Sequence, residues 1–367
     1  MFDRRLMQNF NWGLLALTFI MSAVGILTIY SAVNAGSHLV EKSLYIRQLI
    51  WYLIGALLMI ISFLFNYRLL ERWSILIYII CVCMLVFVLL FGKDAGGSRR
   101  WIDLGQFSIQ PSEIIKLAII ISLSGYYSKR INMTGLTFGD LLLPMIMTFI
   151  PFILIVKQPD LGTAILVVII AASVTCFAKI EKKTFWHIIA SGLVFVPMVW
   201  FFLKEYQKRR ILTFLNPDLD PLGAGYHIIQ SKIAIGSGLL YGKGFLKGTQ
   251  NVLSFLPEQQ TDFIFSVLSE EWGFLGAGFL LILFFILILI GLSVAHSCRE
   301  PFGILLSGGI TALLFWEVLV NVGMVMGLMP VVGVALPFIS YGGSSVIIKM
   351  ICIGVLLNVS MRRFLKE

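Results

Sequence analysis

The sequence predicts an all-α protein that crosses a membrane many times and forms one domain over residues 1–367. Hydrophobic residues make up 59% of the chain and charged residues only 13%, and the mean hydropathy is +0.94. These values lie far from the average composition of a soluble globular domain. The apolar residues also gather into runs of about 20, the length that a helix needs to cross about 30 Å of hydrocarbon. Composition and run length therefore both indicate a polytopic membrane protein.

We predict ten transmembrane helices, one for each apolar run of sufficient length. The runs cover approximately residues 12–33, 44–66, 73–92, 109–127, 138–156, 161–178, 184–203, 272–295, 301–326 and 337–360. The fourth is the least regular, because Glu113 and Lys116 interrupt it. One long segment could not lie in a bilayer, residues 204–271 between helices seven and eight, and we expect it to form a large extracytoplasmic loop.

Basic residues beside the runs predict the orientation, because cytoplasmic loops carry the excess of Lys and Arg. With the N-terminus inside, the inner segments hold most of these residues, among them Arg4, Arg5, Arg362 and Arg363. Both termini are therefore predicted to be cytoplasmic. The basic residues of the long loop do not contradict this, since long loops translocate regardless of charge. The inside bias and anionic lipid also explain the net charge of +9, so no nucleic-acid partner is predicted.

Glu113 and Lys116 are candidate functional residues in the fourth run. They lie three residues apart on one helix face, so they can form an ion pair. Ionisable groups at this depth are costly unless they are paired or face a wet cavity. We predict that either single alanine change impairs activity and that exchanging the two charges recovers part of it. Arg100, in the loop before the run, lies beside Trp101, and that loop read by itself is an interfacial turn.

Asp160 lies in the tight connection between the fifth and sixth runs. A carboxylate there can cap the sixth helix and gain about 0.3 to 1 kcal/mol from the helix dipole. It can equally support a catalytic site. The sequence does not decide between the two roles.

The long loop combines glycine-rich turns with positive charge. Residues 226–235 predict a short amphipathic helix, with Ile228, Ile229 and Ile233 on its apolar side and Ser231 on its polar side. Two Gly-X-Gly turns follow at 236–238 and 242–244, and exposed amides in such turns can bind phosphate. A mobile loop is the alternative. The basic residues that would attract an anionic substrate are Arg209, Arg210, Lys232, Lys243 and Lys247.

Asp262 stands where the long loop re-enters the membrane. A helix from there to residue 295 would be about 50 Å long at 1.5 Å per residue, which is too long for one straight crossing. We therefore expect Asp262 near the outer rim of the membrane, on a bent or tilted entry segment, with Phe263 and Phe265 beside it. Partial desolvation there would favour a general-base role.

Several ordered motifs resemble the SEDS family (shape, elongation, division and sporulation), whose members polymerise lipid-linked peptidoglycan precursor. The resemblance covers nearly the whole chain and is greater to the cell-elongation members than to the division members. The motifs are Gly97-Ser-Arg-Arg-Trp-Ile-Asp-Leu-Gly105, Gln110-Pro-Ser-Glu113, Gln158-Pro-Asp-Leu-Gly-Thr163, 225–238, Gly248-Thr-Gln250, Phe255-Leu-Pro-Glu258, Thr261-Asp-Phe-Ile-Phe265 and a C-terminal signature from Asn321 to Ser344.

The resemblance implies a ten-helix membrane glycosyltransferase that joins lipid II units through β-1,4 links. It implies an essential Asp262, supported by Glu113, Lys116 and Asp160, and we add Arg47 to the supporting set. Candidates for binding the pyrophosphate or sugar are Arg100, Arg209, Arg210, Lys232, Lys243 and Ser340. A divalent cation, Mg or Mn, could also balance the pyrophosphate charge, and no other cofactor is expected.

The resemblance also implies a location and a partner. The chain is expected in the bacterial cytoplasmic (inner) membrane, with a class B penicillin-binding protein that cross-links the new glycan and with other membrane proteins of the elongation complex. Two other functions stay open: a flippase for the lipid-linked precursor and a non-catalytic scaffold for a transpeptidase. A flippase requires a charged cavity through the bilayer, whereas the polar residues here gather at one side.

Glu317 and Lys349 depart from the family pattern, which leads us to expect uncharged residues at both positions. They lie at similar depths in consecutive runs, about 14 and 18 Å from the outer ends at 1.5 Å per residue. Opposite charges at the bilayer midplane are costly enough that they are expected to meet. The alternative is that each faces a wet cavity or another neighbour. We predict a structural ion pair between them.

Overall fold

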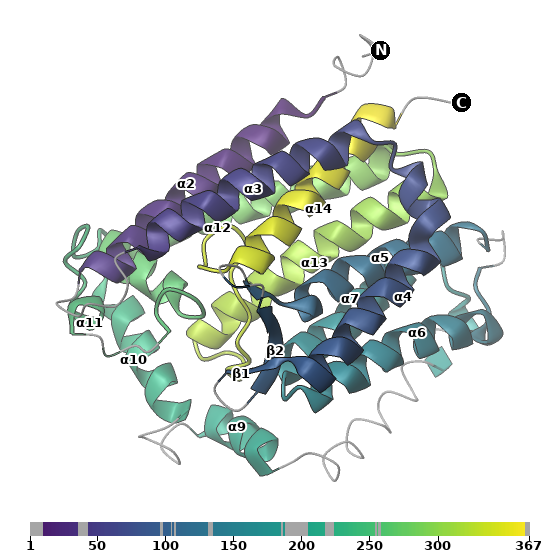
Figure 1. The fold of residues 1–367 in the computed structure, drawn as a ribbon. Coiled ribbons are helices and arrows are strands. Elements are labelled where there is room, and N and C mark those ends of the chain that lie inside the picture. The colour runs from purple at the N-terminus through teal and green to yellow at the C-terminus, as the bar shows by residue number, and fades with distance from the viewer. Residues whose placement is uncertain are drawn as a thin grey trace.

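The structure is a computed structural model that describes residues 10–35, 43–95, 98–103, 105, 108–130, 135–184, 186–187, 205–216, 224–253, 255 and 258–363. Long helices pack side by side through these residues (Figure 1). Seven of the described helices are long and apolar enough to cross a membrane, namely α2 (Trp12–Asn34), α3 (Leu44–Leu64), α4 (Arg68–Phe91), α6 (Phe138–Lys157), α12 (Ile264–Ser297), α13 (Pro301–Val325) and α14 (Gly343–Arg362). The chain is therefore a multi-pass membrane protein, as the composition predicts.

Two further helices coincide with predicted spans. They are α5 (Pro111–Ser128) and the shorter apolar helix α7 (Leu161–Phe177). The predicted seventh span, 184–203, lies almost entirely outside the described residues, so the count of ten helices stays a prediction. A small antiparallel sheet that the sequence did not reveal precedes α5, with strands β1 (Lys93–Ala95), β2 (Ser98–Asp103) and β3 (Ser108–Ile109).

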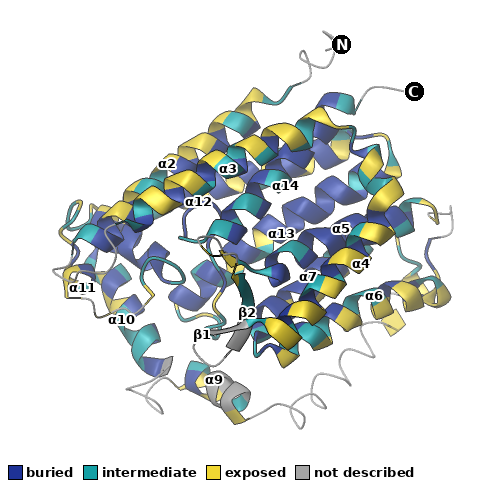
Figure 2. Ribbon diagram, in the orientation of Figure 1, coloured by how far each residue is buried: buried dark blue, intermediate teal, exposed yellow. Residues whose placement is uncertain are grey.

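Helices α13 and α14 form the centre of the bundle. In the most apolar 18-residue stretches of α13 and α14, 72% and 83% of the residues are buried, against 28% in that of α4. Figure 2 shows the same contrast between centre and periphery. α13 packs against α12, α5 and α7, while α14 packs against α3. Polar groups on these central helices must therefore find partners within the protein.

Helix α12 is long, as predicted, and it is broken as predicted. It begins at Ile264, eight residues before the expected start of the eighth span, and Gly273 interrupts it with φ 63° and ψ −162°. The break frees backbone groups that need partners in an apolar environment. The loop 238–244 supplies them through four hydrogen bonds, Phe274 N to Leu239 O (2.8 Å), Leu275 N to Leu240 O (3.1 Å), Lys243 N to Glu270 O (3.0 Å) and Gly244 N to Glu271 O (3.0 Å).

The long loop before α12 is largely helical among its described residues, in α9 (Glu205–Leu215), α10 (Ala224–Ser237) and α11 (Thr249–Val252). The helix predicted at 226–235 lies in α10, and Ile228 is buried as predicted, but the predicted placement of Ser231 and Ile233 is wrong. Ser231 is fully buried, whereas Ile233 is 45% exposed. The reason is a hydrogen-bond network, because the Ser231 hydroxyl contacts Ser266 Oγ (2.8 Å) and donates to Val325 O (2.6 Å).

The last helix starts later than predicted. α14 begins at Gly343, and residues 336–342 form a tight turn in place of the helix start expected at 337. The Ser340 hydroxyl closes this turn by accepting a hydrogen bond from Leu336 N (2.8 Å). Phe338 has a positive φ of 61°, which a continuing helix does not allow.

Candidate active site

The Asp262 segment is held in place by hydrogen bonds to its backbone. Asn321 of α13 donates through Nδ2 to Asp262 O (3.0 Å) and to Val334 O (2.7 Å). The Ser340 hydroxyl donates to Thr261 O (2.6 Å). These bonds fix the chain on both sides of a carboxylate that is partly exposed, next to the buried Phe263. Asp262 is therefore a positioned side chain at the start of α12.

Space beside the carboxylate is kept by a glycine. Gly333 has a positive φ of 71°, and a Cβ at this position would lie 3.3 Å from Asp262 Oδ2. Any other residue would combine an unfavourable backbone conformation with crowding of the carboxylate. The segment between α13 and α14 thus shapes the surroundings of Asp262.

Two residues of α3 hold the 336–342 turn from its other side. Gln48 donates through Nε2 to Ser340 O (3.2 Å) and accepts at Oε1 from Gly342 N (3.2 Å), and Tyr52 donates its hydroxyl hydrogen to Phe338 O. Both side chains are buried. Gln48 and Tyr52 were not predicted from the sequence. A glutamine inside an apolar run was the signal that could have indicated them.

Glu113, Lys116, Glu317 and Lys349 form one buried network, which we call the charge quartet. Lys116 Nζ lies 2.6 Å from Glu113 Oε1 and 2.6 Å from Glu317 Oε1. Lys349 Nζ lies 2.9 Å from Glu113 Oε2 and 2.9 Å from Glu317 Oε1. No side chain of the four is more than 11% exposed. Both predicted pairs are present, but each charge contacts two opposite charges, so neither pair is isolated.

Asp160 has the capping role that the sequence offered, and its support of a catalytic site stays a prediction. Its Oδ1 accepts from Thr163 N (3.3 Å) and so caps α7. Its Oδ2 accepts from Gln110 Nε2 (3.4 Å) and lies 4.0 Å from Arg100 Nη1. Gln110 N in turn donates to Ser344 Oγ (3.1 Å). The first turns of α5, α7 and α14 therefore meet at this point.

The glycine-rich loop does not offer the free amides that the sequence suggested. The amides of Lys243 and Gly244 donate to the carbonyls at the break in α12. The Lys243 ammonium donates to Glu270 Oε1 (2.7 Å) and to Thr249 Oγ1 (2.6 Å). Glu270 is fully buried. It was not predicted from the sequence, because nothing in the sequence of a predicted loop indicates that a carboxylate is buried. The loop is a packed support for α12.

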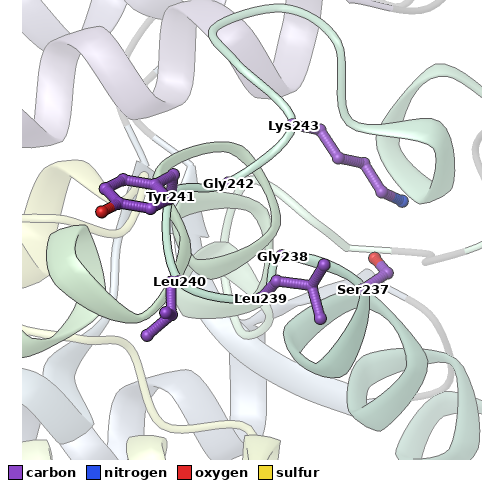
Figure 3. A pocket seen from close by; sticks show the side chains of 7 residues that line it. All are labelled: Ser237, Gly238, Leu239, Leu240, Tyr241, Gly242 and Lys243. Carbon is purple, nitrogen blue, oxygen red and sulfur yellow. The ribbon is translucent and has the colours of Figure 1, made fainter.

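A cavity of 580 Å³ lies along this loop and is lined by residues 237–243 (Figure 3). Leu239 and Tyr241 on its wall are 79% and 80% exposed. Asp262 is not among the lining residues. An apolar hollow in which the Lys243 charge is already paired is poorly suited to a pyrophosphate.

The remaining predicted residues lie on α3, α9 and α10. Arg47 is exposed on the first turn of α3, and Lys232 is exposed on α10, where its side chain runs against Gly327. Arg209 and Arg210 belong to α9, but their side chains lie outside what the structure describes. Across the described residues, no three His, Cys, Asp or Glu side chains are grouped so that they could hold a metal ion.

The site offers one partly exposed carboxylate, fixed by its backbone and backed by buried, balanced charges. Such a carboxylate can accept a proton from a hydroxyl group that attacks a neighbouring centre. The charge quartet is buried within the bundle and joins α5, α13 and α14.

Comparisons with known proteins place these features in a family. A family model for cell cycle proteins, named for FtsW, RodA and SpoVE, matches residues 11–364. Peptidoglycan glycosyltransferase MrdB of Escherichia coli (strain K12) is 44% identical over 314 residues, which cover 84% of this chain and 83% of that protein.

Solved structures are similar over almost the whole chain. A chain of a peptidoglycan synthase complex, described for its coordination of polymerization and crosslinking, has a TM-score of 0.83 and 30% identity and covers 97% of this chain and 99% of its own. The rod shape determining protein RodA of Thermus thermophilus has a TM-score of 0.72 and 26% identity, covering 97% and 98% of the two chains.

Proposed function

The chain belongs to the FtsW, RodA and SpoVE family of cell cycle proteins, and on this premise we propose that it is a peptidoglycan glycosyltransferase. It polymerises lipid II into β-1,4-linked glycan strands during cell elongation, in the bacterial inner membrane. It has ten membrane-spanning helices and both termini in the cytoplasm. The main observation in support of the proposed site is the partly exposed Asp262 at the start of α12. Its backbone segment accepts hydrogen bonds from Asn321 and Ser340.

Asp262 acts as the general base. The 4-hydroxyl oxygen of the acceptor sugar forms a bond to the anomeric carbon of the donor, and its proton passes to the Asp262 carboxylate. The bond between that carbon and the lipid pyrophosphate breaks, and the pyrophosphate leaves with the electron pair. Attack from the face opposite an α-linked leaving group yields the β-1,4 link.

The leaving pyrophosphate needs positive charge. Arg100, which contacts Asp160 at the start of α7, is one candidate, and Arg47, Arg209, Arg210 and Lys232 are further candidates. A divalent cation would be held mainly by the pyrophosphate oxygens, because Mg²⁺ needs only one or two protein carboxylates when a substrate supplies phosphates. Asp262 is the carboxylate suited to that contact. The cation would supply charge neutralisation when it is bound.

A partner completes the synthesis of cell wall. The similar chain in the peptidoglycan synthase complex supports an association with a class B penicillin-binding protein, which would cross-link the glycan that this chain makes. Other membrane proteins of the elongation complex are expected around this pair.

Turnover of purified lipid II by the purified protein tests the proposal. Asp262→Asn should reduce glycan polymerisation about 10²- to 10⁴-fold, the usual contribution of a general base, while the protein still folds. Asp140→Asn is the matched control. Asp140 is a carboxylate in the first turn of α6, where it accepts a hydrogen bond from the Thr137 hydroxyl in a capping box. Polymerisation by the Asp262→Asn protein at the wild-type rate would exclude the base role. Movement of lipid II across vesicles without polymer would favour a flippase, and neither activity would favour a scaffold.

A further inference from the structure

The charge quartet joins three helices, α5, α13 and α14. Glu317 precedes Asn321 by four residues on α13, which is one helical turn, and Asn321 binds Asp262 O (3.0 Å). Lys349 lies six residues after Gly343, where α14 leaves the turn that contains Ser340. Glu317 is thus about one helical turn from Asn321, and Lys349 is about two turns from the start of α14, next to the turn that contains Ser340.

The third helix, α5, is connected to the same region through Gln110, the residue before its start. Glu113 follows Gln110 by three residues, and Gln110 contacts both Asp160 and Ser344. Lys349 Nζ also lies 3.4 Å from Ser345 Oγ, next to Ser344. A shift or rotation of α13 or α14 relative to α5 would therefore displace the groups that fix Asp262.

We propose that Glu317 and Lys349 are positioning residues for the transfer reaction. They bind Lys116 and Glu113 (2.6 and 2.9 Å) and thereby hold α13 and α14 in register with α5, so that Asn321 and Ser340 keep Asp262 in place. This role rests on the proposed function, because it acts through Asp262.

The quartet allows positioning to be separated from stability. Removing Glu317 or Lys349 alone leaves one uncompensated charge among buried groups, which is strongly destabilising. Removing both leaves Glu113 and Lys116 as a neutral pair at 2.6 Å, but it removes every ionic contact from α13 and α14 to α5. The double change therefore restores charge balance without restoring the register of the helices.

The test compares Glu317→Gln, Lys349→Met and the double variant as purified full-length proteins with lipid II. Each single variant should lower the thermal midpoint and kcat. The double variant should regain most of the thermal midpoint, while its kcat stays about tenfold to 10²-fold below wild type, the scale of a misplacement of up to 1 Å. KM should change little, and Lys349→Arg, which keeps the charge, should retain most of kcat.

Asn358→Ala is the matched control on the same helix. Asn358 is equally buried and donates to Ser62 O (2.8 Å) near the other end of α14, so its loss should lower the thermal midpoint but leave kcat unchanged. A second readout needs no turnover. Gln260→Cys should react faster with a membrane-impermeant maleimide in the double-variant background than in the otherwise wild-type chain, because the Asp262 segment is less firmly held.

Three results would overturn the inference: a double variant with wild-type kcat and unchanged labelling, a double variant that does not accumulate as folded protein, or an Asn358→Ala protein with the same loss of kcat. The proposed function is checked separately with Asp262→Asn. An inactive Asp262→Asn protein beside a fully active double variant rejects positioning alone, whereas an active Asp262→Asn protein rejects the base role itself.

Discussion

Exchange of the charges of Glu113 and Lys116 distinguishes an isolated ion pair from the charge quartet. The sequence predicts that Glu113→Lys/Lys116→Glu preserves the pair and recovers activity. The structure predicts the opposite, because the new lysine would face Lys349, whose ammonium lies 2.9 Å from Glu113 Oε2, and the new glutamate would face Glu317, which lies 2.6 Å from the Lys116 ammonium.

The magnitude follows from these distances. Two like charges 2.9 Å apart repel by about 6 kcal/mol at an effective dielectric constant of 20. The exchange creates two such contacts where two attractive ones stood. A folded protein is stable by only about 5–15 kcal/mol, so the exchanged protein should accumulate poorly or unfold at a much lower temperature.

The matched variant reverses all four charges, with Glu317→Lys and Lys349→Glu added. Every contact of the quartet is then attractive again, so the fourfold variant should be more stable than the twofold one. Thermal midpoints of detergent-purified protein and polymerisation of lipid II measure the effect. A twofold exchange as stable and active as wild type, or a fourfold variant no better than the twofold one, would refute the network argument.

Three further outcomes are expected. Gly273→Ala should lower the thermal midpoint, because residue 273 has φ 63° and an added Cβ would overlap Gly242 N; Gly278→Ala, where an added Cβ meets open space, is the control, and equal midpoints would contradict the reasoning. Although burial raises the pKa of the Glu300 carboxyl, hydrogen bonds from Arg68 and Tyr67 outweigh it and hold that pKa below 4.5, so this stabilisation is present above pH 4.5 and is lost as the pH falls further. Wild type should therefore lose thermal stability on acidification below pH 4.5 more steeply than Glu300→Gln, and parallel pH profiles would exclude the contribution. Polymerisation should be slower with the isolated chain than with its class B penicillin-binding protein at saturating lipid II, and equal rates would reject the dependence.

Hydropathy along the chain determined the membrane class, most of the span positions and the break in α12. Span positions depend on the length of apolar runs, which is a local property. The break followed from a similar argument, since a helix from Asp262 to residue 295 exceeds the bilayer thickness. The meeting of Glu317 and Lys349 could also be predicted, because their depths are fixed by the number of residues from the helix ends and because an isolated charge at that depth is costly.

The tertiary structure alone decided which side chains share a partner. A helix that is apolar on all sides gives no information about its rotation, and the sequence does not say which helices are neighbours. The union of the two ion pairs, the binding of the 336–342 turn by Gln48 and Tyr52, and the burial of Ser231 all depend on that rotation and lateral packing. The glycine-rich loop follows the same logic. Its sequence predicts amides that could bind an anion. Only the packing of the loop against the break in α12 shows that the Lys243 and Gly244 amides donate to carbonyls of that helix.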